Sequence, residues 1–329
     1  MSLSINLGRW RSMLEYGPFA AHTNNPLFVQ FSGGATSGFM ACMAPDNAVI
    51  TYQNTGREHE KTLEFVQRVG DELKRDIVWL EWRPPSGEGS PPDMFKWERV
   101  NFTSAARKGE PFYECMKALA AYRKSKNEEP IAPWARQRLC TTYLKHRVLD
   151  HYVRDQGIHA HDRWIGLRAD EPHRVAGLRK QETRDKGLHV PLYEGGISVW
   201  DIHAFWEKQP FSLGIEAFRG NCDGCFLKDQ ADQSRAIGTE PSAVEFWARM
   251  QREFPRFGGQ DHPGYVALAH ELPTRLGIET ALREQREPED DGRLLPKRFL
   301  NVLRQEKRRF EDGSSQWSCA CETKIDDEV

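Results

Sequence analysis

Short apolar runs, each ended by small polar residues, alternate with amphipathic stretches along the first eighty residues. Residues 27–31 (LFVQF), 48–52 (AVITY) and 76–82 (DIVWLEW) are rich in β-branched and aromatic side chains, which predicts three buried strands. Between the last two, apolar residues recur at helical spacing over residues 60–74, which predicts an amphipathic helix. A further helix is expected to begin near Thr36. Strands that alternate with helices are typical of a parallel, doubly wound α/β sheet.

The same alternation resumes after a segment in which Pro and Gly are dense. The run RPPSGEGSPP cannot continue regular structure, so it begins an inserted region over about residues 83–135. Four elements are then expected: a helix over 136–152, a strand at 163–167, a strand at 189–193, and a helix opened by the capping-box pair Ser198 and Asp201.

Beyond Lys228 the pattern becomes helical and charged, without internal repeats. The sequence therefore predicts an α/β domain over residues 1–228 and a helical C-terminal extension over residues 229–329. The extension includes a basic helix at 297–310, which would face either a nucleic acid or solvent.

Composition narrows the class of protein. The 329 residues are 39% hydrophobic and 29% charged, as in folded proteins, and the formal net charge of -2 argues against a generally basic protein that coats nucleic acid. No run of about 18 apolar residues is present, so we expect no membrane insertion and a cytoplasmic location. Seven cysteines in such a chain favour reduced thiols or metal ligands over a disulfide framework.

A glycine-rich loop follows the first predicted strand. Ligands bind at the carboxyl ends of strands in open α/β sheets, and the sequence SGGATS lies at that place. Its glycines let backbone N–H groups approach an anion, and the following helix adds its positive end. The loop matches neither GxxxxGK[ST] nor GxGxxG. It predicts a phosphate site, with a plain glycine turn as the alternative. The residues expected to bind the phosphates are Ser32, Gly33, Gly34, Thr36 and Ser37.

Charged residues follow two other strands directly, in YQNTGREHE and WIGLRADEPHR. Carboxylates can hold Mg²⁺ or a ribose, and arginine pairs well with phosphate, although each such residue alone is more often part of a solvated loop. The candidate carboxylates are Glu58, Asp170 and Glu171, and the candidate arginines are Arg57, Arg168 and Arg174.

Four segments together resemble a known family. The loop SGGATS, the stretch NTGREHEKTLEFV, the segment RLCTTYLK and the motif GLRADEPHR span about residues 27–228. In order and approximate spacing they are similar to the phosphoadenosine phosphosulfate (PAPS) reductase-like branch of the adenine nucleotide alpha-hydrolase superfamily, also called PP-loop or N-type ATP pyrophosphatases. SGG-x-TS loops in that family are frequent in phage or mobile-element proteins.

The resemblance implies a HUP-type sheet of about five parallel strands that binds ATP, PAPS or adenylyl sulfate (APS), with Mg²⁺. It implies that the phosphates lie on the loop residues, that Arg168, Glu171 and Arg174 close the phosphate side, and that adenine and ribose lie around residues 52–56. The residues expected to bind the nucleotide there are Asn54, Thr55 and Gly56, and Glu58 follows them as a further candidate. The commonest loop of the family reads SGGKDS, so Ala35 and Thr36 are a departure, and charge for handling pyrophosphate must come from elsewhere.

The cysteines are a separate signal. GNCDGCFLK provides the CxxC pair Cys222 and Cys225, and RLCTT provides Cys140. The resemblance implies that these three bind a [4Fe-4S] cluster, with zinc or free thiols as alternatives. The candidates for a fourth ligand are Cys115, Cys319 and Cys321. Cys42 is expected to be a small core residue.

Three functions remain open from the sequence. The first is cleavage of ATP between the α- and β-phosphates, with adenylylation of an acceptor coupled to sulfur transfer. The second is a sulfonucleotide (PAPS or APS) reductase, although its ECGxH tail and paired cysteines are absent. The third is a nucleotide-binding module without catalysis. Cys222, Cys225 and Cys321 are the candidate catalytic thiols, and the candidate partners are an adenine nucleotide, a nucleic-acid acceptor and a sulfur-donor protein.

Overall fold

A computed structural model gives the arrangement of most of the first 265 residues. The described residues are 5–10, 17–19, 25–86, 94–128, 138–181, 187–216, 219–220, 222–228, 232–233, 236, 242–254 and 264–265.

Six strands form one sheet in the order β4-β3-β2-β1-β5-β6. Their bounds are β1 Leu27–Gln30, β2 Val49–Gln53, β3 Ile77–Arg83, β4 Lys96–Val100, β5 Asp162–Trp164 and β6 Leu188–His189. All neighbouring pairs are parallel except β3 with β4, which is antiparallel. Strand order runs outward from β1 in both directions, so this is a mostly parallel, Rossmann-like sheet with one antiparallel edge strand.

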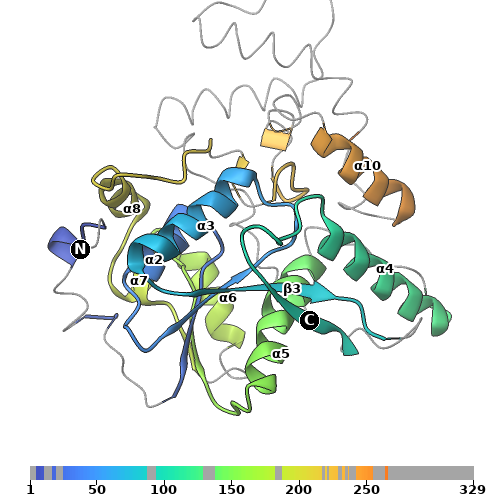
Figure 1. Ribbon diagram of the computed structural model, residues 1–329, viewed down its shortest axis with the longest axis horizontal. Helices are drawn as coiled ribbons and strands as arrows, with labels where there is room; N and C mark the ends of the chain where they lie inside the picture. Colours follow the sequence, from blue (N-terminus) through green and yellow to red (C-terminus); the bar gives the residue numbers. More distant parts are fainter. Residues whose placement is uncertain are drawn as a thin grey trace, which may run out of the picture.

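Helices cover both faces of the sheet (Figure 1). Their bounds are α2 Ala35–Cys42, α3 Glu60–Leu73, α4 Glu110–Ser125, α5 Arg147–Asp155, α6 Pro172–Gln181, α7 Pro191–Glu194, α8 Val199–Trp206 and α10 Ser242–Glu253. Two shorter elements are the 3-10 helix η1 (Gly8–Trp10) and the π-helix η3 (Thr141–His146).

The alternation of β3 shows how the two layers form. Trp79 packs into the core beneath α2, α3 and α8, whereas Leu80 and Trp82 point to the opposite core, which α4, η3, α5 and α10 cover. Successive side chains of a strand point to opposite faces, so a strand buried on both sides reads as a continuous apolar run. This explains why DIVWLEW shows no polar alternation.

Most of the predicted elements are present within a few residues of their predicted bounds. Strands β1, β2 and β3, helices α3 and α8, and the mostly parallel order of the sheet are confirmed. The expected number of about five strands was too low, because the antiparallel edge strand β4 adds a sixth. The predicted capping box also forms: the Ser198 side chain accepts from the backbone N–H of Asp201, and the Asp201 carboxylate accepts from Ser198 N–H at 3.0 Å. Helix α2 begins at Ala35, one residue before the predicted start.

One prediction on local structure was wrong. The expected strand at 189–193 is the end of β6 followed by α7, because Pro191 provides the first residue of a short helix. The expected helix over 136–152 is present as one helical segment, in which the π-helix η3 leads directly into α5. The region 83–135 contains the antiparallel strand β4 and the helix α4, which the Pro- and Gly-rich start of the region concealed.

The C-terminal extension is described only in part. Helix α10 shares a core cluster with α4 and β3, and the basic helix at 297–310, Cys319 and Cys321 lie outside the described residues. Within the described part of the chain, no helix is both long and apolar enough to cross a bilayer.

Candidate functional site

Two loops meet at the carboxyl edge of the sheet, between β1 and β5. These strands are neighbours, but the chain leaves β1 toward β2 on one side and reaches β5 on the other. Strand order therefore reverses here, and open α/β sheets bind their ligands at such a switch point. SGGATS follows β1, and the GLRADE segment follows β5.

The SGGATS loop is folded by its own side chains. Ser37 Oγ accepts a hydrogen bond from Ser32 N–H at 3.1 Å and lies 2.9 Å from Ser32 Oγ, and it donates to the Gly34 carbonyl at 3.1 Å. Gly33 has φ +84°, and an added Cβ would lie 2.5 Å from Thr62 Cγ2. The first turn of α2 holds no acidic residue, and no side chain caps its start at Gly34. The loop thus presents backbone N–H groups and the positive end of α2, as an anion site requires.

Arg168 joins the two loops. Its Nη1 donates to Thr36 Oγ1 at 3.1 Å, and its Nε and Nη2 donate to Asp170 at 3.1–3.2 Å. Asp170 in turn accepts from Val199 N–H at 2.9 Å, which ties the start of α8 to the same loop. The guanidinium is buried and held in one position, so a cation lies beside the anion loop before any ligand binds.

Glu171 connects Arg168 to Arg174. The buried Glu171 carboxylate accepts from Arg168 N–H at 2.8 Å and from Arg174 Nη1 at 2.6 Å. A buried carboxylate needs such partners, since leaving it uncompensated is costly. The structure therefore brings together Arg168, Glu171 and Arg174 as one network that reaches the loop through Thr36.

The segment after β2 is also buried and internally bonded. Glu58 accepts from Thr55 N–H at 3.0 Å and from Thr55 Oγ1 at 2.9 Å, so its carboxylate closes the turn. Asn54 Nδ2 donates to Glu81 at 2.6 Å and to the Ala106 carbonyl at 2.9 Å. These side chains therefore set the shape of the loop that includes Gly56.

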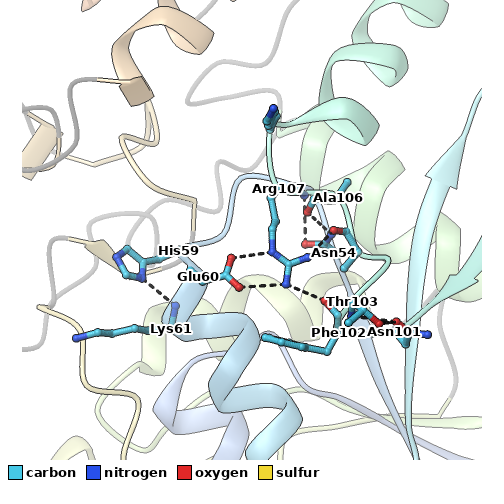
Figure 2. Close-up of polar contacts among 12 residues, drawn as sticks. Asn54, His59, Glu60, Lys61, Asn101, Phe102, Thr103, Ala106 and Arg107 are labelled. Carbon is cyan, nitrogen blue, oxygen red and sulfur yellow. Dashed lines mark hydrogen bonds and ion pairs between the residues drawn. The ribbon is translucent and has the colours of Figure 1, made fainter.

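Figure 2 shows what holds the loop 101–109 over this segment. Arg107 makes a two-pronged pair with Glu60, at 2.8 and 3.0 Å, and also donates to the Phe102 carbonyl at 2.7 Å. Asn54 contacts the same loop at Ala106. The paired guanidinium and carboxylate fix the loop at the carboxyl ends of β2 and β3.

Arg57 does not face the phosphate side, contrary to expectation. Its guanidinium carbon lies 4.6 Å from the centre of the Phe246 ring and 5.7 Å from that of Trp247, both on α10. A cation over an aromatic face is a stabilising contact, so Arg57 anchors α10 to the segment after β2.

The predicted metal-ligand cysteines gather in one place. Cys222 and Cys225 belong to the core cluster beneath α10, and Cys140 and the fully buried Cys115 pack into the same cluster. Glu58 and Cys222 form an isolated antiparallel bridge, and Thr55 Oγ1 lies 3.4 Å from Cys222 Sγ. The thiols thus lie next to the β2 loop, at the carboxyl edge of the sheet that also carries SGGATS. Cys42 is a buried core residue of α2, as predicted.

Lys145 places a half-buried positive charge beside these thiols. Burial acts to lower the pKa of Lys145, but the Glu58 carboxylate and the thiols of Cys222, Cys140 and Cys225 outweigh it and raise the pKa above its ordinary value. Burial raises the pKa of Cys222 to about 12 and of Cys225 to about 11, and Lys145 opposes both shifts. The resting thiols are therefore protonated at neutral pH, beside an ammonium group that would stabilise a sulfur anion formed there.

The described residues contain no group of three or more His, Cys, Asp or Glu side chains arranged to hold a metal ion. The carboxylates proposed for Mg²⁺ are engaged elsewhere: Glu58 with Thr55, Asp170 with Arg168 and Glu171 with Arg174. As arranged, these carboxylates do not form a ligand set. The cysteines have the right donor chemistry and share one cluster, but their side chains would have to converge to bind a metal.

Sequence reasoning missed Lys145 and the residues that cover the thiols. In the π-helix η3 the backbone hydrogen bonds join residues five apart, so side chains five apart lie on the same face. Cys140 and Lys145 have this spacing, and in an ordinary α-helix they would lie on different faces. Trp247 and Tyr265 lie more than twenty residues beyond the CxxC pair, and no local pattern indicates their contact with it.

Comparison with known proteins gives one informative similarity. No family model matches the chain. The "Uncharacterized nin region protein ORF290" of Escherichia phage lambda is 27% identical over 300 residues, which cover 88% of this chain and 93% of that protein. The chain is therefore similar, over most of its length, to a phage protein whose description gives no activity.

Proposed function

We propose that this chain is an adenine-nucleotide-binding enzyme, similar to the PAPS reductase-like family, that cleaves ATP between the α- and β-phosphates and couples adenylylation of an acceptor to sulfur transfer. The observation that carries the proposal is the hydrogen bond between Arg168 and Thr36 across the switch point of the sheet. It joins an anion loop to a preorganised cation at the edge where ligands of such sheets bind.

The loop and the arginines have complementary parts in the first step. An acceptor oxygen attacks the α-phosphorus, the bond from that phosphorus to the bridging oxygen breaks, and pyrophosphate leaves with the electron pair. The N–H groups at the start of α2 would stabilise the charge on the leaving group, and Arg168 and Arg174 would neutralise it. The guanidinium groups thereby replace the charge that Ala35 and Thr36 do not supply.

The thiols provide the second step. A persulfide on Cys222, formed by a sulfur-donor protein, attacks the adenylylated carbon with its terminal sulfur, and the C–O bond to AMP breaks. The Cys225 thiol then attacks the Cys222 sulfur, which leaves the transferred sulfur on the acceptor and forms a Cys222–Cys225 disulfide. An external dithiol reduces that disulfide. Lys145 would stabilise the persulfide anion, because its ammonium group lies among these thiols.

The reaction is tested by incubating anaerobically purified full-length protein with radiolabelled ATP and Mg²⁺, with and without bulk RNA or DNA as acceptor. A parallel sample receives phosphoadenylyl sulfate and a dithiol. When an acceptor is present, we expect pyrophosphate from ATP and an equal amount of AMP that stays bound to the acceptor, because no persulfide is supplied to displace it. Release of sulfite would identify a sulfonucleotide reductase, and ATP that binds without turnover would identify a binding module. Either result would overturn the proposed reaction.

A second route for the same thiols, which excludes the persulfide on Cys222, is an iron–sulfur cluster held by Cys140, Cys222 and Cys225, with zinc as the rival. Its support is the gathering of these thiols in one core cluster beside the Lys145 ammonium group. Such a cluster would supply an iron able to take up sulfide. Protein purified without oxygen is expected to be brown, with absorbance near ~400 nm, as is general for iron–sulfur proteins.

Cysteine substitutions distinguish a bound cluster from iron that binds non-specifically. The variant Cys222→Ser is expected to lose the colour and the bound iron, because it removes one of three ligands. Cys42→Ser is the matched control, since Cys42 is a buried thiol on α2 in the other core and should leave the iron content unchanged. Colourless protein with bound zinc, or equal loss in both variants, would contradict the cluster.

A further inference from the structure

The turn that carries Cys222 and Cys225 is held on one side by the β2 loop. Asp223 N–H donates to the Arg57 carbonyl at 2.9 Å, and Cys222 pairs with Glu58 in a short antiparallel bridge. Within the turn, Cys225 N–H donates to the Cys222 carbonyl at 3.2 Å. These bonds fix the start of the turn. The carbonyl groups of Asp223 and Gly224 take no part in them.

Two aromatic residues from the C-terminal part of the chain bind those carbonyl groups. Trp247 Nε1 donates to the Asp223 carbonyl at 2.8 Å, and the Tyr265 hydroxyl donates to the Gly224 carbonyl at 2.7 Å. The two rings are stacked, with centres 5.8 Å apart and planes at 18°, and both side chains are fully buried. Consecutive carbonyl groups of the thiol turn are thus held by a rigid aromatic pair.

The pair is itself anchored to the α/β core. Trp247 packs edge-on against Phe112 of α4 at 5.4 Å, and the Tyr113 hydroxyl donates to Glu253 at the end of α10 at 2.8 Å. In Figure 1, α10 lies alongside α4. The described part of the C-terminal region therefore forms one wall of the thiol site.

We propose that Trp247 and Tyr265 are positioning residues for the Cys222–Cys225 thiol pair: they fix the backbone of its turn, so that the Cys222 sulfur stays beside Thr55 and the Cys225 sulfur stays in the same core cluster. This rests on the proposed function, in which the two thiols exchange sulfur with each other. Loss of one buried donor leaves a carbonyl without its partner, so the turn opens more often.

The test is the rate at which each cysteine is alkylated, measured by iodoacetamide labelling and peptide mass spectrometry on the full chain without nucleotide. Tyr265→Phe removes only the hydroxyl and is the decisive variant. We expect Cys222 and Cys225 to be labelled about tenfold faster in it, since a lost buried hydrogen bond has about that effect on an opening equilibrium. Trp247→Phe should act in the same direction, although it also leaves a small void.

A matched control removes a ring donor elsewhere. Trp97→Phe deletes an indole donor that binds Asp155 on the surface, far from the turn in sequence and outside its hydrogen bonds. It should leave the labelling of Cys222 and Cys225 unchanged.

Two results would overturn this role. Equal acceleration at Cys42 in Tyr265→Phe would mean general destabilisation, and unchanged labelling of Cys222 and Cys225 would mean that the bonds to Arg57 and Glu58 suffice. Neither result depends on ATP, so failure of this inference is distinguishable from failure of the proposed reaction. ATP binding at the SGGATS loop should be the same in Tyr265→Phe and the unaltered protein.

Discussion

Replacing Gly33 by alanine is expected to abolish nucleotide binding and to destabilise the fold. The backbone of Gly33 has φ +84°, which costs an L-residue about 1–2 kcal/mol, and the new methyl group would lie 2.5 Å from Thr62 Cγ2 and 3.3 Å from Tyr52 Cε2. Relief of the clash must move α3 or the loop away. We expect a loss of about 3 kcal/mol in unfolding free energy, measured by urea denaturation, and at least about a hundredfold weaker ATP binding.

Two other glycines separate the causes of this effect. Gly196 has φ +66° with nothing within 4 Å of an added Cβ, so Gly196→Ala should show only the backbone cost. Gly34 has φ -86°, and an added Cβ would lie 3.9 Å from Ser32 Oγ. Gly34→Ala should therefore keep the stability but weaken ATP binding, since the methyl group enters the anion loop. Full stability and full ATP binding in Gly33→Ala would refute this description of the loop.

Replacing Arg168 by alanine is expected to have the second largest effect. The substitution removes the hydrogen bond to Thr36 and the charge beside the buried Glu171 carboxylate. Glu171 then keeps only its contact with Arg174 among these arginines. Breaking a buried ion pair by removing one partner costs about 3–5 kcal/mol. Because Glu171 keeps Arg174 as a partner, we expect a smaller stability loss of about 2 kcal/mol and, in protein that remains folded, ATP binding weakened at least about a hundredfold, measured by equilibrium dialysis.

The controls for Arg168 distinguish charge from geometry. Arg168→Lys keeps the positive charge but loses the planar fork that reaches Asp170 and Thr36 together, so it should recover stability more than ATP affinity. Thr36→Val removes only the hydroxyl that Arg168 contacts, and should weaken ATP binding with little loss of stability. Wild-type affinity in folded Arg168→Ala would show that the cation lies outside the ligand site.

The fold was largely predictable from local pattern because its central strands are buried on both faces. Strand β3 is a nearly continuous apolar run, and helix α3 has apolar residues at helical spacing. The capping box at Ser198 marks the start of α8. Strand β4 was not predictable in the same way. It is an edge strand with exposed charged residues such as Lys96 and Glu98, so it lacks a clear apolar face.

The candidate site was predictable where residues follow strands and not where distant segments meet. Because the carboxyl ends of parallel strands share one edge, the loop residues and Arg168 were expected to converge. Lys145 was missed because the π-helix changes the spacing that brings it to the thiols. The contacts of Trp247 and Tyr265 with the CxxC turn depend on tertiary packing, which no short window of sequence encodes.

The SGGATS loop is proposed to bind an adenine nucleotide, with Arg168 as the cation beside its phosphates. The most direct test is equilibrium dialysis of the full chain against radiolabelled ATP, with unlabelled ATP, GTP and AMP as competitors. We expect one radiolabelled ATP bound per chain. Unlabelled ATP should displace it, GTP and AMP should displace it poorly, and Gly33→Ala and Arg168→Ala should not bind it. Absence of ATP binding, or binding that persists unchanged in folded Arg168→Ala, would contradict it.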